Sequence, residues 1–452
     1  MTVAADPASL LRDRRYVGLL VLAVILGVPI SAVAYGFLKL AAELETWVFT
    51  DLPRAVGLHG EPLWWPLAPL VLGGLIVGVT IRYLPGRGGH SPAEGLKADG
   101  GAPTGRELPG IAIAALATLG MGAVLGPEAP LIALGGGLAV LVVRVVRPGA
   151  PATAALLVGA AGSFAAVSTL LGSPLLGAFL MMEAIGLGGE MLGLVLVPGL
   201  LASGIGALIF LGLNSWTGWG TLSLSVPNLP HFARPDVAQF GWALVIGLVA
   251  APVGVGIRWL ALRLRGRVER HLVLATPAMG LAVAGLAIAF AAGSGKANSW
   301  VLFSGQSALG PLITQSATFS VGALVLLIAC KGLAYAGSLS SFRGGPIFPA
   351  MFIGATGGIA LSHLPGLPLV PAVAMGIGAM TVVMLRLPMV SVLLATLLLL
   401  SAGLAVMPLV IVAVVVAYVT AARLTPAPAP AATSPAPSPP PPAETPVPTP
   451  RR

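Results

Sequence analysis

Long stretches without a charged side chain dominate this sequence and restrict it to a membrane fold. A transmembrane helix needs about 20 apolar residues, and nine charge-free runs approach or exceed that length. They are residues 17–38, 63–80, 148–182, 191–233, 237–257, 272–295, 297–330, 344–385 and 387–422. Only 9% of the residues are charged, against about 25% in soluble domains. We therefore expect an all-α, polytopic integral membrane protein that is surrounded by the lipid bilayer.

Glycine and proline are unusually frequent, with 60 and 41 residues respectively. Glycine lets helices approach one another closely, and proline ends or kinks a helix. Several of the long runs hold two segments, or a span plus a half-span, which gives roughly ten or more helical pieces. The composition thus predicts many short, interrupted helices, and the alternation of a transmembrane barrel is absent.

Basic side chains gather in short loops and give a formal net charge of +9. The clusters are Arg12, Arg14 and Arg15; Arg82 and Arg87; and Arg258, Arg263, Arg265, Arg267 and Arg270. Short arginine-rich loops stay in the cytoplasm, so the charge reflects topology and not the binding of nucleic acid. We expect a cytoplasmic N-terminus in a plasma membrane of the bacterial type. The single cysteine, Cys330, excludes an internal disulfide.

The hydrophobic part of the chain divides into two halves at the polar segment 214–236. We expect one transmembrane domain over residues 1–424, with halves at 17–215 and 237–424. The tail, residues 425–452, is rich in proline and has no apolar periodicity. That composition predicts a disordered, polyproline-like extension.

The two halves share an order of features. Residues 173–180 are similar to residues 387–394, because in each a proline starts an apolar helix. Upstream of each lies a breaker rich in glycine and proline, at 126–130 in the first half and 344–349 in the second. Paired interruptions in two halves indicate a transport site at the interface between repeats.

One acid, Glu128, lies in the first of these two breakers. It is the only ionisable side chain between Glu107 and Arg144. A carboxylate at membrane depth costs roughly a few kcal/mol or more, and such residues mark ion or proton pathways. Pro127 and Pro130 on either side predict a broken helix, which is how membrane proteins build ion sites.

A further breaker, residues 88–92, precedes the other two. Each of the three can start a helix whose first N–H groups have no intrahelical partner, and such groups favour an anion. Helix starts that meet at mid-membrane hold an anion without a full positive charge, which would bind it too tightly to conduct. The alternative interpretation is that each breaker is a kink or a turn.

The three breakers resemble the anion-site signatures of the CLC family of chloride channels and proton-coupled chloride transporters. Those signatures have the forms GSGIP, G(K/R)EGP and GxFxP, in this order. The resemblance is clearest over residues 116–136, which contain Glu128, and over residues 341–352. It extends over residues 88–424, and the first two spans fit as well.

The resemblance implies a CLC-type fold of two inverted-topology repeats, with many tilted and re-entrant helices. It also implies a homodimer with a separate pore in each subunit. By position, Glu128 matches the family's gating glutamate, which occupies an anion site when ionised and swings away when protonated. Chloride is then the substrate, and no cofactor or metal is expected. The anion-binding positions that the signatures imply are Gly89, Ser91, Gly126, Ala129, Gly345, Ile347 and Phe348.

The sequence departs from the family pattern at several of these places. Gly89 stands where the first signature has serine, so that anion contact there would come from the backbone or from Ser91. Pro127 replaces the basic residue before the gating glutamate, and Ile347 replaces the phenylalanine of the third signature. Tyr418 lies too early in the last helix to match the family's anion-binding tyrosine.

Three other charged residues keep two interpretations each. The inner glutamate that passes protons in the coupled transporters is Ala184 here, and its neighbour Glu183 is either an inner proton relay or a buried structural acid. Lys331 adds positive potential near the ion path, or else snorkels or pairs with a carboxylate. Arg343 draws anions into a cytoplasmic vestibule, or is solvated in a loop.

These features predict transport of inorganic anions, with chloride favoured, by a voltage- or pH-gated channel of the CLC type. The missing inner glutamate favours uncoupled conduction. A proton-coupled chloride antiporter is the alternative, because another acid or a water chain can replace the relay. An organic-anion transporter and an intramembrane enzyme are remoter alternatives, and the sequence has no HExxH motif and no pair of intramembrane aspartates.

Overall fold

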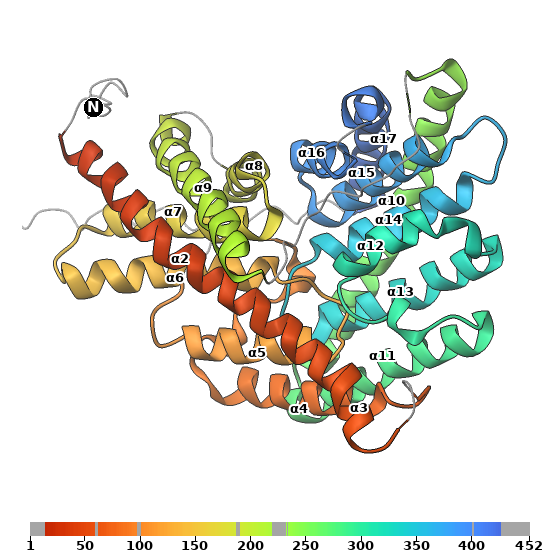
Figure 1. Ribbon diagram of the computed structural model, residues 1–452, viewed down its shortest axis with the longest axis horizontal. Helices are drawn as coiled ribbons and strands as arrows, with labels where there is room; N and C mark the ends of the chain where they lie inside the picture. The colour runs from red at the N-terminus through yellow and green to blue at the C-terminus, as the bar shows by residue number, and fades with distance from the viewer. Residues whose placement is uncertain are drawn as a thin grey trace, which may run out of the picture.

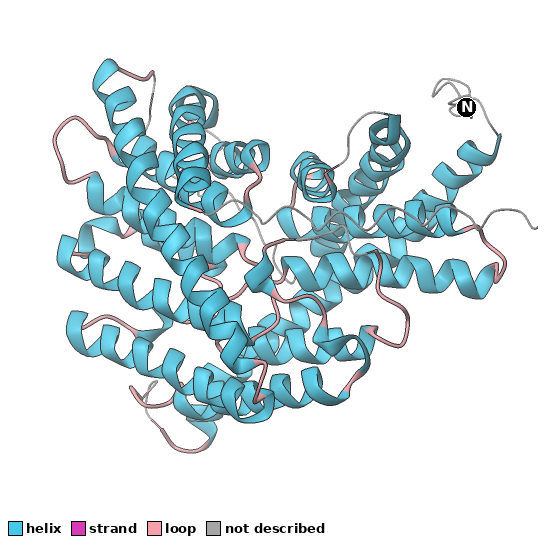
Figure 2. Ribbon diagram, turned by 180° about the vertical axis from the view of Figure 1, so that it is seen from behind, coloured by secondary structure: helices cyan, strands magenta, loops and turns pink. Residues whose placement is uncertain are grey.

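The protein is built of helices that cross one another at many angles (Figure 1). The structure, a computed structural model, describes residues 14–58, 62–96, 101–186, 190–218, 232, 234–399 and 402–425. Over these ranges the regular structure is helical, with one isolated bridge between two residues (Figure 2). The all-α prediction is therefore confirmed, while the prediction for the tail falls outside the described residues from 426 onward.

The first half of the chain supplies eight described helices and three short turns. They are α2 (Arg14–Thr46), η1 (Trp47–Asp51), α3 (Leu52–Ala55), α4 (Leu67–Tyr83), η2 (Pro85–Gly88), η3 (Pro92–Glu94), α5 (Leu108–Gly120), α6 (Glu128–Val146), α7 (Ala152–Leu171), α8 (Pro174–Ile185) and α9 (Glu190–Thr217).

The second half supplies eight more helices and two turns. They are α10 (Val237–Val268), α11 (Leu272–Ser294), η4 (Asn298–Trp300), α12 (Gln306–Thr314), η5 (Ser316–Thr318), α13 (Val321–Ser341), α14 (Ile347–Leu361), α15 (Leu369–Leu385), α16 (Pro388–Leu398) and α17 (Gly403–Leu424).

Helix length varies as the glycine and proline content predicts. Among the described residues, eight helices are long and apolar enough to cross a membrane. Six others are apolar but only 10–17 residues long, namely α4, α5, α8, α14, α15 and α16. Short apolar helices of this kind are the partial helices from which transporters build sites inside the membrane.

One helix extends beyond the charge-free run in which it begins. The charge-free run 297–330 ends at Cys330, but α13 continues through Lys331 to Ser341. The earlier part of the run holds η4, α12 and η5 instead of a span. The charge-free run and the helix differ in their ends because Lys331 is buried inside the helix.

The two halves repeat one packing unit. Helices α6 and α7 pack closely because Gly135 and Gly162 lie opposite each other, and a Cβ on either would collide with the other's backbone. Helices α14 and α15 meet in the same way at Gly354 and Gly376. The next helix of each half, α8 or α16, begins with proline at its first position. The repeat seen weakly in the sequence is thus a repeat of structure.

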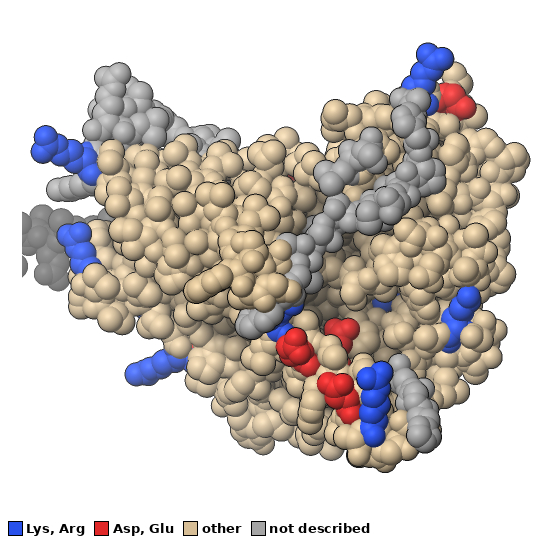
Figure 3. Space-filling model, in the orientation of Figure 1, with Lys and Arg blue, Asp and Glu red and all other residues tan. Residues whose placement is uncertain are grey.

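Figure 3 shows one face of the molecule, and most of it carries no charged side chain. Apolar side chains such as Val21 and Ile25 on α2, or Leu244 and Leu248 on α10, are about half exposed. Extended exposed apolar surface marks contact with membrane. Charged side chains on this face lie mainly at its edge and over the end of α2 and α3 (Figures 1 and 3). The protein is accordingly a multi-pass membrane protein.

Candidate functional site

The second and third breakers meet at the interface between the two halves. The Gly126 N–H donates to the Gly345 carbonyl at 2.8 Å, and the Gly345 N–H donates back to the Gly126 carbonyl at 2.5 Å. The pairing is antiparallel, as expected when two inverted segments face each other. Helix α6 starts two residues after Gly126 and α14 starts two residues after Gly345. Two helix N-termini are therefore brought to one place inside the protein.

The Glu128 side chain lies between these two helix starts and is fully buried. Its Oε1 atom accepts a hydrogen bond from the Phe348 N–H at 3.0 Å. A Cβ added at Gly126 or Gly345 would overlap the carboxylate, so both positions must be glycine for the acid to fit. The carboxylate thus occupies the position where the start of α14 can hold an anion.

The second carboxylate oxygen of Glu128 has no hydrogen-bond partner among the described residues. A buried carboxylate oxygen without a donor is costly. This atom is where a proton can bind, and protonation removes the charge that the helix start attracts. The two carboxylate oxygens therefore differ, because one is held by the start of α14 and the other has no donor in the described part of the chain.

The main-chain segments around Glu128 are held by side chains that sequence reasoning did not select. The Val124 N–H donates to the Ser338 Oγ at 3.0 Å, and the Tyr335 hydroxyl donates to the Pro346 carbonyl at 2.7 Å. The Arg343 N–H donates to the Thr118 Oγ1 at 3.2 Å. Thr118 lies eight residues before the second breaker, and Tyr335 and Ser338 lie nine and six residues before the third, so the breakers themselves did not mark these side chains in the sequence.

The structure brings together five of the seven predicted anion-binding positions. Gly126, Ala129, Gly345, Ile347 and Phe348 belong to the two helix starts that meet at Glu128. Whether they bind an anion stays a prediction.

The first breaker is built differently. In place of the expected helix there is a single 3₁₀ turn, Pro92–Glu94. The backbone of Gly89 has a φ of 93°, which residues with a side chain rarely adopt. Ser91 is buried, and its Oγ has no hydrogen-bond partner among the described residues. The breaker is connected to the third one through Arg343, whose Nε donates to the Arg87 carbonyl at 3.3 Å.

Glu183 lies at the contact of α8 with α16. Its two carboxylate oxygens accept hydrogen bonds from the Met389 and Val390 N–H groups, at 3.1 and 2.8 Å. A carboxylate at a helix start stabilises that helix, so this geometry favours the structural interpretation of Glu183. Tyr418 is 40% exposed on α17, which places it away from the buried helix starts.

Lys331 follows neither of the two side-chain arrangements that its position suggested. It does not snorkel, because it is fully buried. Its ammonium donates to the carbonyl oxygens of residues 300–303 at 3.0–3.3 Å, and not to a carboxylate. Sequence patterns cannot show this partner, because main-chain carbonyls are available from any residue type.

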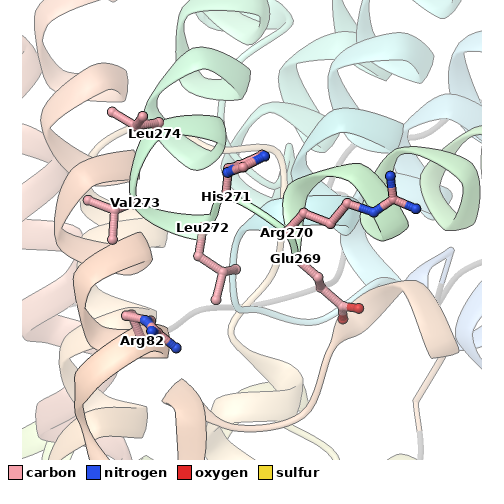
Figure 4. A pocket seen from close by; sticks show the side chains of 7 residues that line it. All are labelled: Arg82, Glu269, Arg270, His271, Leu272, Val273 and Leu274. Carbon is pink, nitrogen blue, oxygen red and sulfur yellow. The ribbon is translucent and has the colours of Figure 1, made fainter.

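A surface pocket lies apart from these helix starts, at the turn between α10 and α11. Figure 4 shows its lining, which comes from the end of α4 and from that turn. The lining residues are Arg82, Glu269, Arg270, His271, Leu272, Val273 and Leu274. None of the predicted anion-site residues belongs to it. Among the described residues, no group of three or more His, Cys, Asp or Glu side chains lies close enough to hold a metal ion.

Comparison with known proteins gives consistent matches. A protein family described as "Voltage gated chloride channel" matches residues 73–422. The "Putative ion-transport protein YfeO" of Escherichia fergusonii is 28% identical over 370 residues, which cover 80% of this chain and 84% of that protein. The protein of the same name from Salmonella schwarzengrund is 28% identical over 377 residues, covering 80% and 85%.

Two solved structures share the fold. A slow cyanobacterial Cl⁻/H⁺ antiporter superposes with a TM-score of 0.72 at 18% identity, over 90% of this chain and 94% of that one. A CLC-type fluoride/proton antiporter superposes with a TM-score of 0.63 at 21% identity, over 89% and 95%. At these identities the likeness describes the fold and not the substrate.

Proposed function

The chain belongs to the voltage-gated chloride channel (CLC) family, and we propose that it conducts chloride as a channel whose gate is Glu128. It is an integral membrane protein of a family that transports anions. Chloride selectivity, gating by pH or voltage, and uncoupled conduction are the parts that we propose. We also propose the family's homodimer with one pore in each subunit.

The observation that carries the proposal is the contact of the Glu128 carboxylate with the start of α14. The Phe348 N–H that binds Oε1 belongs to the first turn of α14, where an N–H group has no acceptor within its own helix. The same donor can bind a halide once the carboxylate leaves. An ionised Glu128 and a chloride ion therefore compete for one position, and this competition is what makes the side chain a gate.

Protonation opens the gate in this mechanism. A neutral carboxyl loses the attraction of the helix dipole and its charge-assisted hydrogen bond. The side chain then leaves the start of α14, and an anion from either side can enter. Because Pro127 stands where a basic residue is found in the family signature, the anion is held by N–H groups without that full positive charge. Weak, dipole-based binding permits rapid release.

The proposal of uncoupled conduction depends on the residues at the position of the inner proton relay. Ala184 offers no proton acceptor, and both carboxylate oxygens of Glu183 already accept hydrogen bonds from α16. A proton that reaches Glu128 from outside thus has no acid at the inner relay position to receive it. The antiporter alternative is favoured by the activity named for the two structures of similar fold.

The deciding experiment measures chloride efflux and proton movement together in proteoliposomes. The expected result is chloride efflux that increases as pH falls, without protons moving in fixed proportion. Uphill chloride movement driven by a proton gradient would replace the channel by the antiporter. If chloride does not move but fluoride does, the proposed substrate is wrong. Absence of any inorganic anion flux would overturn the proposed function.

A further inference from the structure

Lys331 is a buried charge that the gating mechanism does not use. It lies within α13, and it is fully inaccessible to solvent. Its ammonium group donates to the carbonyls of Trp300, Val301, Leu302 and Phe303, at 3.1, 3.0, 3.0 and 3.3 Å. The ammonium also lies 4.4 Å from the centre of the Phe352 ring on α14.

This arrangement excludes a direct role in binding an anion. A lysine ammonium has three hydrogens to donate, and four carbonyl oxygens already surround it. An added anion would have to displace those carbonyls, which would then lie unpaired in an apolar interior at high cost. Lys331 must therefore act through the segment that it holds.

That segment leads directly to the chain before Glu128. Phe303 has a φ of 58°, which non-glycine residues rarely adopt, and its N–H donates to the Gly122 carbonyl at 3.2 Å. The Phe303 ring packs edge-on against Phe49, with ring centres 4.9 Å apart. Gly122 lies against both rings. The hydrogen bonds from Lys331 to the carbonyls of residues 300–303 thus stabilise the uncommon backbone conformation of Phe303. Phe303 in turn holds Gly122 through its N–H group.

Two more residues on the same face of α13 hold the remaining parts of the gate. Tyr335 and Ser338 follow Lys331 by four and seven residues, which places all three on one side of the helix. Tyr335 donates to the Pro346 carbonyl beside the start of α14. Ser338 accepts from the Val124 N–H, in the segment that leads to Glu128.

We infer that Lys331, Tyr335 and Ser338 form a polar stripe on α13 that positions the gate, with Lys331 as its buried anchor. The stripe holds both sides of the contact between Glu128 and Phe348. Lys331 and Ser338, at the two ends of the stripe, hold the segment that leads to Glu128. Tyr335, in the middle, holds the segment that leads to the Phe348 N–H group. The inference rests on the proposed function where it concerns gating, while the positional part can be tested without any transport.

The positional test uses amide hydrogen exchange measured by mass spectrometry on the full-length protein. Lys331→Met is compared with Lys296→Met, a matched control whose ammonium lies at a partly exposed site above the Phe319 ring and beside Thr318. Lys331→Met should increase exchange in residues 300–305 and 121–126, and Lys296→Met should leave both segments unchanged. Unchanged exchange in residues 121–126 of Lys331→Met would overturn the inference, whether or not the protein transports anions.

The gating test is a double-mutant cycle in proteoliposomes. Lys331→Met should raise chloride flux at neutral pH by roughly two- to thirtyfold, the range of couplings carried through packed networks. The same change made together with Glu128→Gln should have little further effect, because the gate is already disabled. An equal fold-change in both backgrounds would show that Lys331 does not act through Glu128.

Ser338→Ala supplies a second route if Lys331→Met does not fold. Its matched control is Ser340→Ala, because among the described residues the Ser340 hydroxyl bonds the Gly337 carbonyl and the adjacent Ser341 hydroxyl, both within α13. Ser338→Ala should raise flux in the native background and not beside Glu128→Gln. If Ser338→Ala and Ser340→Ala behave alike, the stripe does not position the gate.

Discussion

Glu128 combines two local properties that the proposed gate requires. One carboxylate oxygen is bound by the first turn of α14, and the other has no partner among the described residues. In the proposed gate, the first property stabilises the ionised, closed state. The second leaves a place for a proton without any change elsewhere in the backbone.

Glu128→Gln should leave chloride flux high and nearly independent of pH. Glutamine cannot ionise, so it makes no charge-assisted hydrogen bond to the Phe348 N–H. Such a bond contributes about 1.5–3 kcal/mol, which corresponds to roughly ten- to a hundredfold in gate occupancy. Efflux from proteoliposomes between acidic and alkaline pH measures this. Glu107→Gln, a change at the nearest preceding acid, is the control, and retention of the native pH profile by Glu128→Gln would remove Glu128 from the gate.

Gly345→Ala should reduce chloride flux at all pH values. The added methyl group would occupy the space of the carboxylate, and the anion that replaces it needs the same space. Overpacking of about 1–3 kcal/mol predicts a loss on the order of tenfold. Gly310→Ala is the control, because nothing lies within 4 Å of a Cβ there. Recovery of flux in the double variant with Glu128→Gln would contradict this explanation, since the methyl should exclude the anion in either case.

At the scale of elements, the fold depends on helices that end inside the protein and must be capped there. Helix α16 begins at Pro388, and its early N–H groups at Met389 and Val390 are bound by Glu183 from α8. The contact joins the two halves of the chain. It also explains how an acid can remain in an apolar region as a structural residue.

Glu183→Ala should therefore lower stability more than it changes transport. Two hydrogen bonds to a charged acceptor are lost, and the expected cost is roughly 1–3 kcal/mol because the site is partly exposed. Thermal unfolding in detergent measures the loss, and Glu183→Gln should retain part of the stability by keeping one acceptor. If Glu183→Gln instead abolished proton movement in a protein of native stability, Glu183 would be the inner proton relay.

At the scale of the whole molecule, topology follows from where the arginines lie. The turn between α10 and α11 is rich in arginine, so it should face the cytoplasm. Helix α11 then crosses outward, and η5 should lie outside. The single native cysteine, Cys330, is buried, which leaves a low background for labelling.

Two single substitutions test this orientation with a membrane-impermeant thiol reagent on intact spheroplasts. Ala317→Cys in η5 should react from outside, because Ala317 is exposed. Arg270→Cys in the α10–α11 turn should react only after the membrane is permeabilised. The opposite pattern would invert the predicted topology.

The sequence alone was sufficient for the class of fold and for the key acid. Charge-free runs predict spans because a charged side chain in lipid is costly, and breakers predict partial helices because glycine and proline act locally. Glu128 stands out for the same reason, being alone in its run. The helix starts at α6 and α14 were therefore readable from neighbouring residues, with no knowledge of what they would face.

The hydrogen-bond partners of these acids could be found only in the tertiary structure. Glu128 and Phe348 are 220 residues apart, and Glu183 and Val390 are 207 apart. Such contacts depend on how two repeats pack, which no local pattern contains. Lys331 shows the same limit, since its four acceptors are main-chain carbonyls whose direction is set by the backbone and not by residue type. Local patterns were enough to show that an isolated acid lies at a broken helix. The second helix start that faces this acid is known only from the fold, because only packing can bring two distant N-termini to one point.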